Sequence, residues 1–345
     1  MGFFILKDFK TFHYVKAFFE LKREMIDLKS LDNFRKIGDP LADQFVDIHF
    51  SNSEKKSELY LGIQSLRKNS DWALFIKSFP DASWFDQEFS KSSVPDVRQI
   101  KSAVQFYKSK ELYISQLLGL LSLPYCYAAA DGAKVLYQTE RMYKDVNKRL
   151  EETGAFVADI MSKNAFSEDG KGKVQLFKVR LMHAVSRHYI LKGNWDLKLG
   201  YPINQEDMLG TNLSFSLIVI RGLRKMGFDI SYEQQMAYIN YWSWIGELLG
   251  IQPALLPNDG KEAHNIEEAI SKRQFKSSEE GKQLTKSLLE CFYKLNTSQA
   301  IKNNEIPAFM RFLLGDAVST ILDLPPGSFP ASKKIMLKFK TALNP

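Results

Sequence analysis

Apolar side chains recur at helical spacing along most of the chain. Within residues 139–162 they return every three or four positions, which places them on one face of a long helix. The same periodicity predicts helices over residues 173–191, 205–226 and 232–249. We therefore expect helices to dominate the fold. The apolar face of the first helix consists of Met142, Val146, Leu150, Thr153, Val157 and Ile160.

Residues at helix ends support this interpretation, and strand signals are weak. Ser231 followed by Gln234 forms a capping box at the start of one helix, and Gly250 is suited to end it. The apolar run 217–220 lies inside a helical pattern, and no Asn-Gly or Asp-Gly turn joins two alternating runs. We predict an all-α protein of a dozen or so helices, organised as a single domain over residues 1–345 with a loosely packed N-terminal third.

One uncharged stretch, residues 112–130, is nearly as long as the roughly 20 residues that a membrane helix needs. Pro124 interrupts it, because proline removes a backbone donor from the helical ladder. We expect a buried helix that ends before Pro124 and a second helix through residues 128–130. Residues 1–10 have neither the basic start nor the cleavage site of a secretory signal. We expect a soluble, cytoplasmic protein without an integral membrane segment.

Composition excludes several classes of protein. With 45% hydrophobic residues, 12 Pro and 19 Gly among 345 residues, the chain is neither disordered nor collagen-like. Cys126 and Cys291 are its only cysteines, which excludes a disulfide scaffold. The net charge of +7 is spread along the chain, with a denser lysine cluster in residues 326–345, where we expect a basic C-terminal helix. This mild excess does not indicate a nucleic-acid partner.

Most sequence signatures of catalysis are absent. The chain has no Gly-rich dinucleotide motif, no P-loop, no His-Glu-x-x-His and no Gly-x-Ser-x-Gly. None of its five histidines follows a glutamate by three residues, which excludes the di-iron carboxylate bundle. Cys-x-x-Cys-His is also missing, which excludes a covalently attached haem. Candidate chemistry therefore rests on polar residues within the apolar helices.

His183 is the candidate with the most unusual surroundings. Arg180 lies three residues before it and Arg187 four residues after it, so a helix places all three on one face. The two guanidinium groups disfavour an imidazolium, which leaves a neutral ring able to ligate a metal ion. They would equally suit the anionic rim of a cofactor. The alternative is a solvent-facing stripe of three polar residues.

A second polar stripe lies on the preceding helix. Arg149, Glu152 and Thr153 stand at positions i, i+3 and i+4. By spacing alone this is a plain Arg–Glu pair on a solvated face, of the kind that contributes little to stability.

The chain resembles a family of haem-dependent oxygenases, which contains the latex clearing proteins (rubber oxygenases) and the fungal endoplasmic-reticulum oxygenases of mycophenolic acid synthesis. The likeness spans about residues 38–325, in the order expected for the family. The segments that carry it are Gly38–Asp43 (GDPLAD), Arg149–Val157 (RLEETGAFV), Val179–Arg187 (VRLMHAVSR), Gly200–Met208 (GYPINQEDM) with Thr211 and Phe215–Ser216, Tyr238–Trp242, Gly246–Gly250 (GELLG), Pro307–Arg311 (PAFMR) and Leu314–Asp316 (LGD).

The resemblance implies an all-α fold with a globin-like core around a non-covalent haem b, within an oxygenase-like catalytic region at residues 30–325. His183 matches the family's proximal iron ligand. Arg180, Arg187 and Arg311 match arginines near the haem and its propionates. The stripe that begins at Arg149 matches residues on the opposite, distal side, which makes Arg149, Glu152 and Thr153 the candidate catalytic residues.

The chain departs from the family at two positions. Rubber oxygenases carry a lysine between the matching arginine and threonine, where this chain has Glu152. A carboxylate there would act as a general base or hydrogen-bond a bound oxygen. The family also has an acidic residue on the preceding helix; the matching position is near Ala133, where Asp131 is the only close acid. Cleavage of polyisoprene is therefore not expected.

We expect a haem-b-dependent oxygenase that uses dioxygen on a small apolar substrate of isoprenoid type. Two alternatives remain open: a haem-binding sensor or carrier, and a helical scaffold of the same fold without the cofactor. The sequence does not define the oligomeric state. Residues that would line the substrate side, or belong to the ordinary core, are Phe156, Leu213, Phe215 and Trp242.

Overall fold

The computed structural model describes residues 31–139, 145–296 and 302–335. This part of the chain is helical, with one isolated antiparallel bridge between Ala129 and Phe275 and no strand. Its α-helices are α2 (Leu31–Phe34), α3 (Pro40–His49), α4 (Ser53–Ser65), α5 (Trp72–Ser78), α6 (Ser83–Lys91), α7 (Val97–Leu117), α8 (Leu123–Tyr127), α9 (Ala130–Gln138), α11 (Val146–Ile160), α12 (Gly172–Lys192), α13 (Gln205–Phe215), α14 (Leu217–Met226), α15 (Tyr232–Leu248), α16 (Gly260–Gln274), α17 (Glu279–Leu295), α18 (Ile306–Leu314) and α19 (Asp316–Ile321). The short elements between them are η1 (Asn69–Asp71), η2 (Pro80–Ala82), η3 (Leu118–Ser122), η4 (Leu197–Leu199), η5 (Pro253–Leu255) and η6 (Asn303–Glu305). The predicted all-α fold is confirmed, with more and shorter helices than expected.

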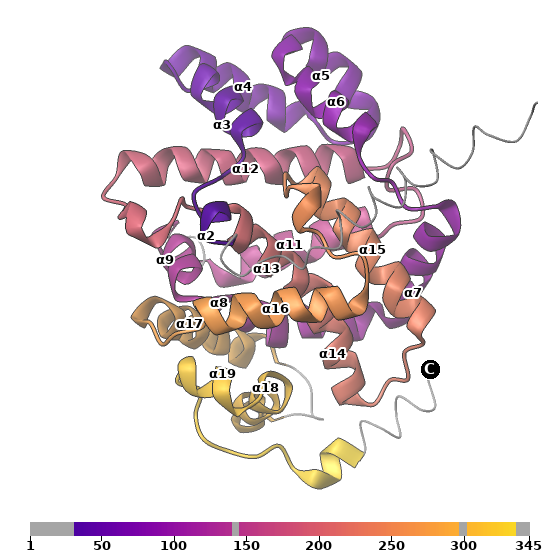
Figure 1. Cartoon of the computed structure of the whole chain (residues 1–345), viewed down its shortest axis with the longest axis vertical. Helices are drawn as coiled ribbons and strands as arrows, with labels where there is room; N and C mark the ends of the chain where they lie inside the picture. Colours follow the sequence, from indigo (N-terminus) through magenta and orange to yellow (C-terminus); the bar gives the residue numbers. More distant parts are fainter. Residues whose placement is uncertain (1–30, 140–144, 297–301, 336–345) are drawn as a thin grey trace, which may run out of the picture.

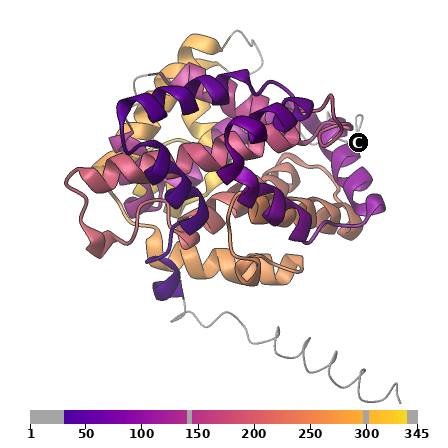
Figure 2. The ribbon, with the colours of Figure 1, turned by 90° about the horizontal axis from the view of Figure 1, so that it is seen from above.

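Helix α12 separates two layers of the molecule (Figure 1). Helices α3 to α6 lie on one side of it, and α11, α13, α15 and α16 lie on the other. The view from above shows the N-terminal helices running across α12 (Figure 2). Helices α18 and α19 are at the opposite end of the molecule from this N-terminal layer. A residue on α12 can therefore face either layer, depending on its position around the helix.

An aromatic cluster joins α12 to the N-terminal layer. The Phe177 ring lies 4.8 Å from Trp72, 5.4 Å from Phe75 and 5.3 Å from Phe85, measured between ring centroids. All four side chains are buried. Burial of aromatic rings in edge-to-face and tilted contacts stabilises such an interface well beyond what loose packing would give. The prediction of a loosely packed N-terminal third therefore does not hold where these four residues pack together.

Two predicted helices are confirmed almost to the residue. The pattern over residues 173–191 corresponds to α12, and the pattern over residues 232–249 corresponds to α15. Ser231 and Gln234 form the expected capping box, and Gly250 follows with a φ of 94°, a conformation that favours glycine.

The helix predicted over residues 205–226 is two helices, α13 and α14. The backbone breaks at Ser216, where φ is −109° and ψ is −83°. The Ser216 hydroxyl donates to the carbonyl of Asn212 at 2.9 Å, a local bond that competes with the helical ladder. Periodicity missed the break because apolar residues on both sides of Ser216 are buried and continue the helical pattern through it.

Pro124 starts a helix instead of following the end of one. Helix α7 passes into the π-helical turn η3, and Pro124 then lies in the first turn of α8, where its missing N–H costs nothing. No helix in the described ranges is long and apolar enough to cross a membrane. Of the helix predicted over 139–162, residues 140–144 lie outside the described part; the rest forms α11. Residues 336–345 of the predicted C-terminal helix also lie outside it.

Candidate functional site

The predicted face Arg180–His183–Arg187 lies on α12, where helical spacing aligns the three side chains. Both arginines are almost fully buried, at 2% and 1% exposure. Burial excludes the alternative of a solvent-facing stripe, since a buried charge has to be paired.

His183 is held as a neutral base. Burial is the main cause that lowers its pKa to about 3, and the positive charges of Arg187 and Arg149 lower it further. Its Nδ1 atom is buried and has no hydrogen-bond partner among the described residues. A neutral imidazole with an unpartnered ring nitrogen is the form of histidine that binds a metal ion.

Arg180 is fully engaged by protein groups. Its Nε lies 2.5 Å from one oxygen of Asp39 and its Nη2 lies 3.0 Å from the other, which makes a bidentate pair. Nη2 also contacts Glu88 at 3.0 Å, and the guanidinium stacks over Trp84 at 4.7 Å. These contacts give Arg180 a positioning role: they fix α12 against α3 and α6 one turn before His183.

Arg187 keeps one donor free. Its Nε donates to Asp43 at 2.6 Å and its Nη1 donates to the carbonyl of Ile203 at 3.2 Å. Its Nη2 is buried without a partner among the residues that the structure describes. Because a buried donor is rarely left unsatisfied, this atom is suited to an anionic group that the protein itself does not supply.

The α11 stripe approaches α12 through Arg149. Its Nη1 lies 3.7 Å from the Sδ of Met182, the neighbour of His183. Glu152 extends toward solvent, with 43% of its side chain exposed, and makes a long 3.4 Å contact with Arg149. The Thr153 hydroxyl donates to the carbonyl of Arg149 at 2.8 Å, within the helix. The structure thus brings Arg149 to His183, while Glu152 points away.

Arg311 is placed apart from the other predicted residues. It lies on α18, which Figure 1 shows beyond α16 and α17 from α12. Its guanidinium donates to the carbonyl of Leu324 at 3.2 Å and to Asp316 at 2.9 Å. These contacts tie α18 to α19 and to the loop after it, and the place of Arg311 beside a cofactor stays a prediction.

The residues suggested for the substrate side belong to the core. Leu213 and Trp242 are buried, and the rings of Phe215 and Trp242 lie 5.3 Å apart. Phe156 and Phe215 are partly buried and pack against the same hydrophobic cluster. Packing in the hydrophobic core therefore accounts for all four side chains.

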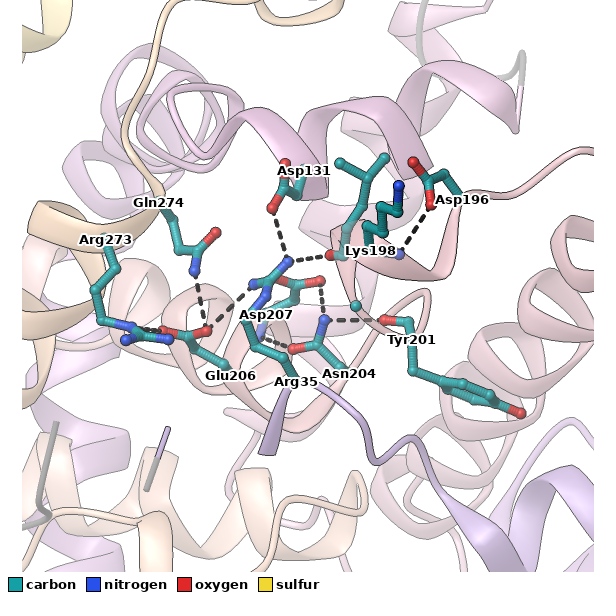
Figure 3. Close-up of polar contacts among 12 residues, drawn as sticks. Arg35, Asp131, Asp196, Lys198, Tyr201, Asn204, Glu206, Asp207, Arg273 and Gln274 are labelled. Atoms are coloured by element: carbon teal, nitrogen blue, oxygen red, sulfur yellow. Dashed lines mark hydrogen bonds and ion pairs between the residues drawn. The ribbon is translucent and has the colours of Figure 1, made fainter. Parts of the chain in front are cut away.

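The structure contains a buried ionic network that was not predicted from the sequence. Figure 3 shows its contacts. Arg35 contacts Asp131 at 3.0 Å, and Glu206 and Asp207 at 3.2 Å each. Glu206, whose side chain is fully buried, also accepts from Arg273 at 2.9 Å. The network joins α2, α9, α13 and α16. Asp131, the acid nearest to Ala133, is therefore committed to an ion pair.

Gln205 links the loops that flank the arginine pairs. Its amide nitrogen donates to the carbonyls of Gly38 and Gly250, at 2.7 and 2.9 Å, and its oxygen accepts from the backbone of Gln252 at 2.8 Å. The dense polar composition of residues 200–208 is the sequence feature from which these buried hydrogen bonds could have been predicted. A segment that is polar and yet buried must have its hydrogen bonds satisfied within the protein.

Acidification is expected to destabilise the protein through His183. The folded-state pKa of about 3 lies below the usual 6.5, so this contribution to stability is complete above pH 6.5 and is lost as the pH falls toward 3. Because the side chain is partly exposed and solvent screens the effect, we expect a loss of about 2–4 kcal/mol. Urea unfolding at pH 7 and pH 4 should show a smaller loss for His183→Gln than for the unchanged protein. Equal losses would contradict the neutral buried imidazole.

Comparison with known proteins identifies the family. Residues 115–345 match the family described as the catalytic domain of ER-bound oxygenase mpaB/B' and rubber oxygenase. The rubber oxygenase of Streptomyces sp. (strain K30) is 25% identical over 233 residues, which cover 66% of this chain and 56% of that enzyme. The chain thus spans little more than half the length of this relative.

A solved structure of latex clearing protein LCP in the closed state is similar in fold, with a TM-score of 0.74. The match covers 90% of this chain and 85% of that chain at 21% identity. The family match includes α11, α12 and α18, and therefore every residue predicted for the site. The chain therefore belongs to the mpaB and rubber oxygenase family of oxygenases.

Proposed function

We propose that this protein is a haem-b-dependent oxygenase that acts on a small apolar substrate of isoprenoid type. His183 would hold the iron, and Arg149 would lie on the side where dioxygen and substrate bind. The observation that carries the proposal is the environment of His183: a neutral imidazole, with a buried and unpartnered ring nitrogen, set among three arginines in a family of oxygenases.

The residues on this face fit a haem group. Imidazole is the usual protein ligand of haem iron in oxygen-binding proteins. The unpartnered Nη2 of Arg187 is a charge-assisted donor suited to a propionate. When bound, the haem would supply oxygen binding and the redox chemistry that no amino-acid side chain provides.

The chain's own residues would control access and charge. Asp39 fixes Arg180, and through it the position of α12 one turn before His183. The guanidinium of Arg149, close to Met182, would place a positive charge on the side where the substrate binds. Because Glu152 extends to solvent, we assign it no role as a base in this conformation.

The absorption spectrum of the protein expressed with a haem precursor tests this function. We expect a Soret band, and oxygen uptake that begins only when an isoprenoid substrate is added. A protein that stays colourless and does not take up added haemin would contradict the proposal. That result would favour the cofactor-free scaffold.

A haem-binding carrier or sensor is the second candidate. It is favoured by the outward position of Glu152, the acid of the α11 stripe, whose side chain is 43% exposed. A Soret band without oxygen uptake on any apolar substrate would support this alternative over the oxygenase.

A further inference from the structure

Tyr127 has a buried hydroxyl group that the described part of the protein does not use. It is the last residue of α8 and only 1% exposed. Its hydroxyl has no hydrogen-bond partner among the described residues. Leaving a buried polar group unpaired costs free energy, so such an atom calls for an explanation.

Tyr127 belongs to a helix that follows a turn close to α11. Helix α8 follows directly on the π-helical turn η3, and a methyl group at Gly119 in that turn would lie 3.8 Å from Leu150 of α11. Leu150 is the neighbour of Arg149. Isolated π-helical turns occur often at functional sites, where they shift the side chains that follow.

The positive charge of Arg149 acts on both His183 and Tyr127. It lowers the pKa of His183 and opposes the rise that burial causes in the pKa of Tyr127. Burial is the larger effect for Tyr127, so the phenol keeps its proton at neutral pH and remains a donor.

The proton of the Tyr127 hydroxyl needs an acceptor that Arg149 cannot supply. A guanidinium has five donors and no acceptor, so Arg149 cannot accept the proton of the Tyr127 hydroxyl. We propose that Tyr127 is a further residue of the site, whose hydroxyl donates a hydrogen bond to the ligand bound beside Arg149. This inference rests on the proposed haem site, and it makes Tyr127 a residue that touches the bound ligand.

The chain offers two matched tyrosine controls. The hydroxyl of Tyr238 is likewise buried, but its neighbours are Trp242 and Tyr107 and not Arg149. The hydroxyl of Tyr241 donates to the carbonyl of Ile160. Replacing each of the three tyrosines with phenylalanine removes one oxygen atom from a buried ring in three different settings.

Without haem, Tyr127→Phe should leave the melting temperature within about 1 °C of the unchanged protein, because no internal hydrogen bond is lost. Tyr241→Phe should lower it by about 2–4 °C. A similar decrease for Tyr127→Phe would mean that its hydroxyl is bonded inside the protein, and would overturn the inference.

With haem, the probes are carbon monoxide on the ferrous protein and azide on the ferric protein. Tyr127→Phe should raise the carbon–oxygen stretching frequency and weaken azide binding about five- to tenfold, the effect of one lost hydrogen bond. Tyr238→Phe should change neither. Unchanged stretching frequency and azide affinity in Tyr127→Phe would overturn the role of Tyr127 alone. A wild-type protein that takes up no haem would overturn the proposed function, and this inference with it.

Discussion

A His183→Ala variant is expected to lose haem binding while keeping its fold. Alanine removes the only side chain of α12 that combines a neutral imidazole with a buried, unpartnered nitrogen among the described residues. Loss of a partner that merely orients a metal ligand already weakens metal binding about 10–100-fold, so loss of the ligand itself should cost at least as much. Titration with haemin, followed by the Soret band, measures the change.

His188→Ala is the matched control. His188 lies on the same helix, but its Nδ1 is 2.7 Å from Asp47 and its imidazole is edge-on to Phe50. Haemin affinity should therefore be unchanged in this variant. Haemin affinity that is unchanged in His183→Ala would exclude His183 as the iron ligand. A loss of affinity in both variants would point to a general effect of altering α12.

The sequence predicted the helices that carry the site, because helix formation follows from local spacing. Residues i, i+3 and i+4 share a helix face whatever the rest of the fold does, so the face of Arg180, His183 and Arg187 could be read directly. The N-cap at Ser231 and the end of α15 before Gly250 were predictable for the same reason.

The partners of those residues could not be predicted from spacing. Arg180 pairs with Asp39 and Arg187 pairs with Asp43, across more than 140 residues of sequence. Helical periodicity says nothing about which distant helix meets which face. The resemblance to the oxygenases included the segment of Asp39 and Asp43, but the assignment of both arginines to the cofactor left those carboxylates without a role.

The contacts of Arg311 could not be predicted from the resemblance. The matched motif predicts Arg311 near the haem, and this stays a prediction; the structure shows its guanidinium bonded to the carbonyl of Leu324 and to Asp316. Glu152 is a second case: its place in the stripe predicts a distal group, and spacing could not show that 43% of its side chain is exposed. A motif fixes residue type and helix, while packing decides where the side chain points.

Removing the carboxylate of Asp39 is expected to cost about 3–5 kcal/mol of unfolding free energy, because an Asp39→Ala variant leaves the charge of Arg180 buried without its main partner. Both side chains are nearly inaccessible, at 2% and 3% exposure. Gly250 allows the pair to form: a Cβ atom there would lie 2.6 Å from Asp39 and 2.9 Å from Arg180. Urea unfolding at pH 7 gives the free-energy difference.

Glu88→Ala is the control for Asp39→Ala, because it removes a partly exposed contact of Arg180 and leaves the buried pair intact. Glu88 also lies 3.0 Å from this guanidinium, but 39% of its side chain is exposed, so its removal should cost no more than about 1 kcal/mol. Because Arg180 precedes His183 by one turn, Asp39→Ala should also weaken haemin binding, and Glu88→Ala should not. Equal stability of the two variants would mean that solvent reaches Arg180, and that the buried pair does not fix α12 against the N-terminal layer.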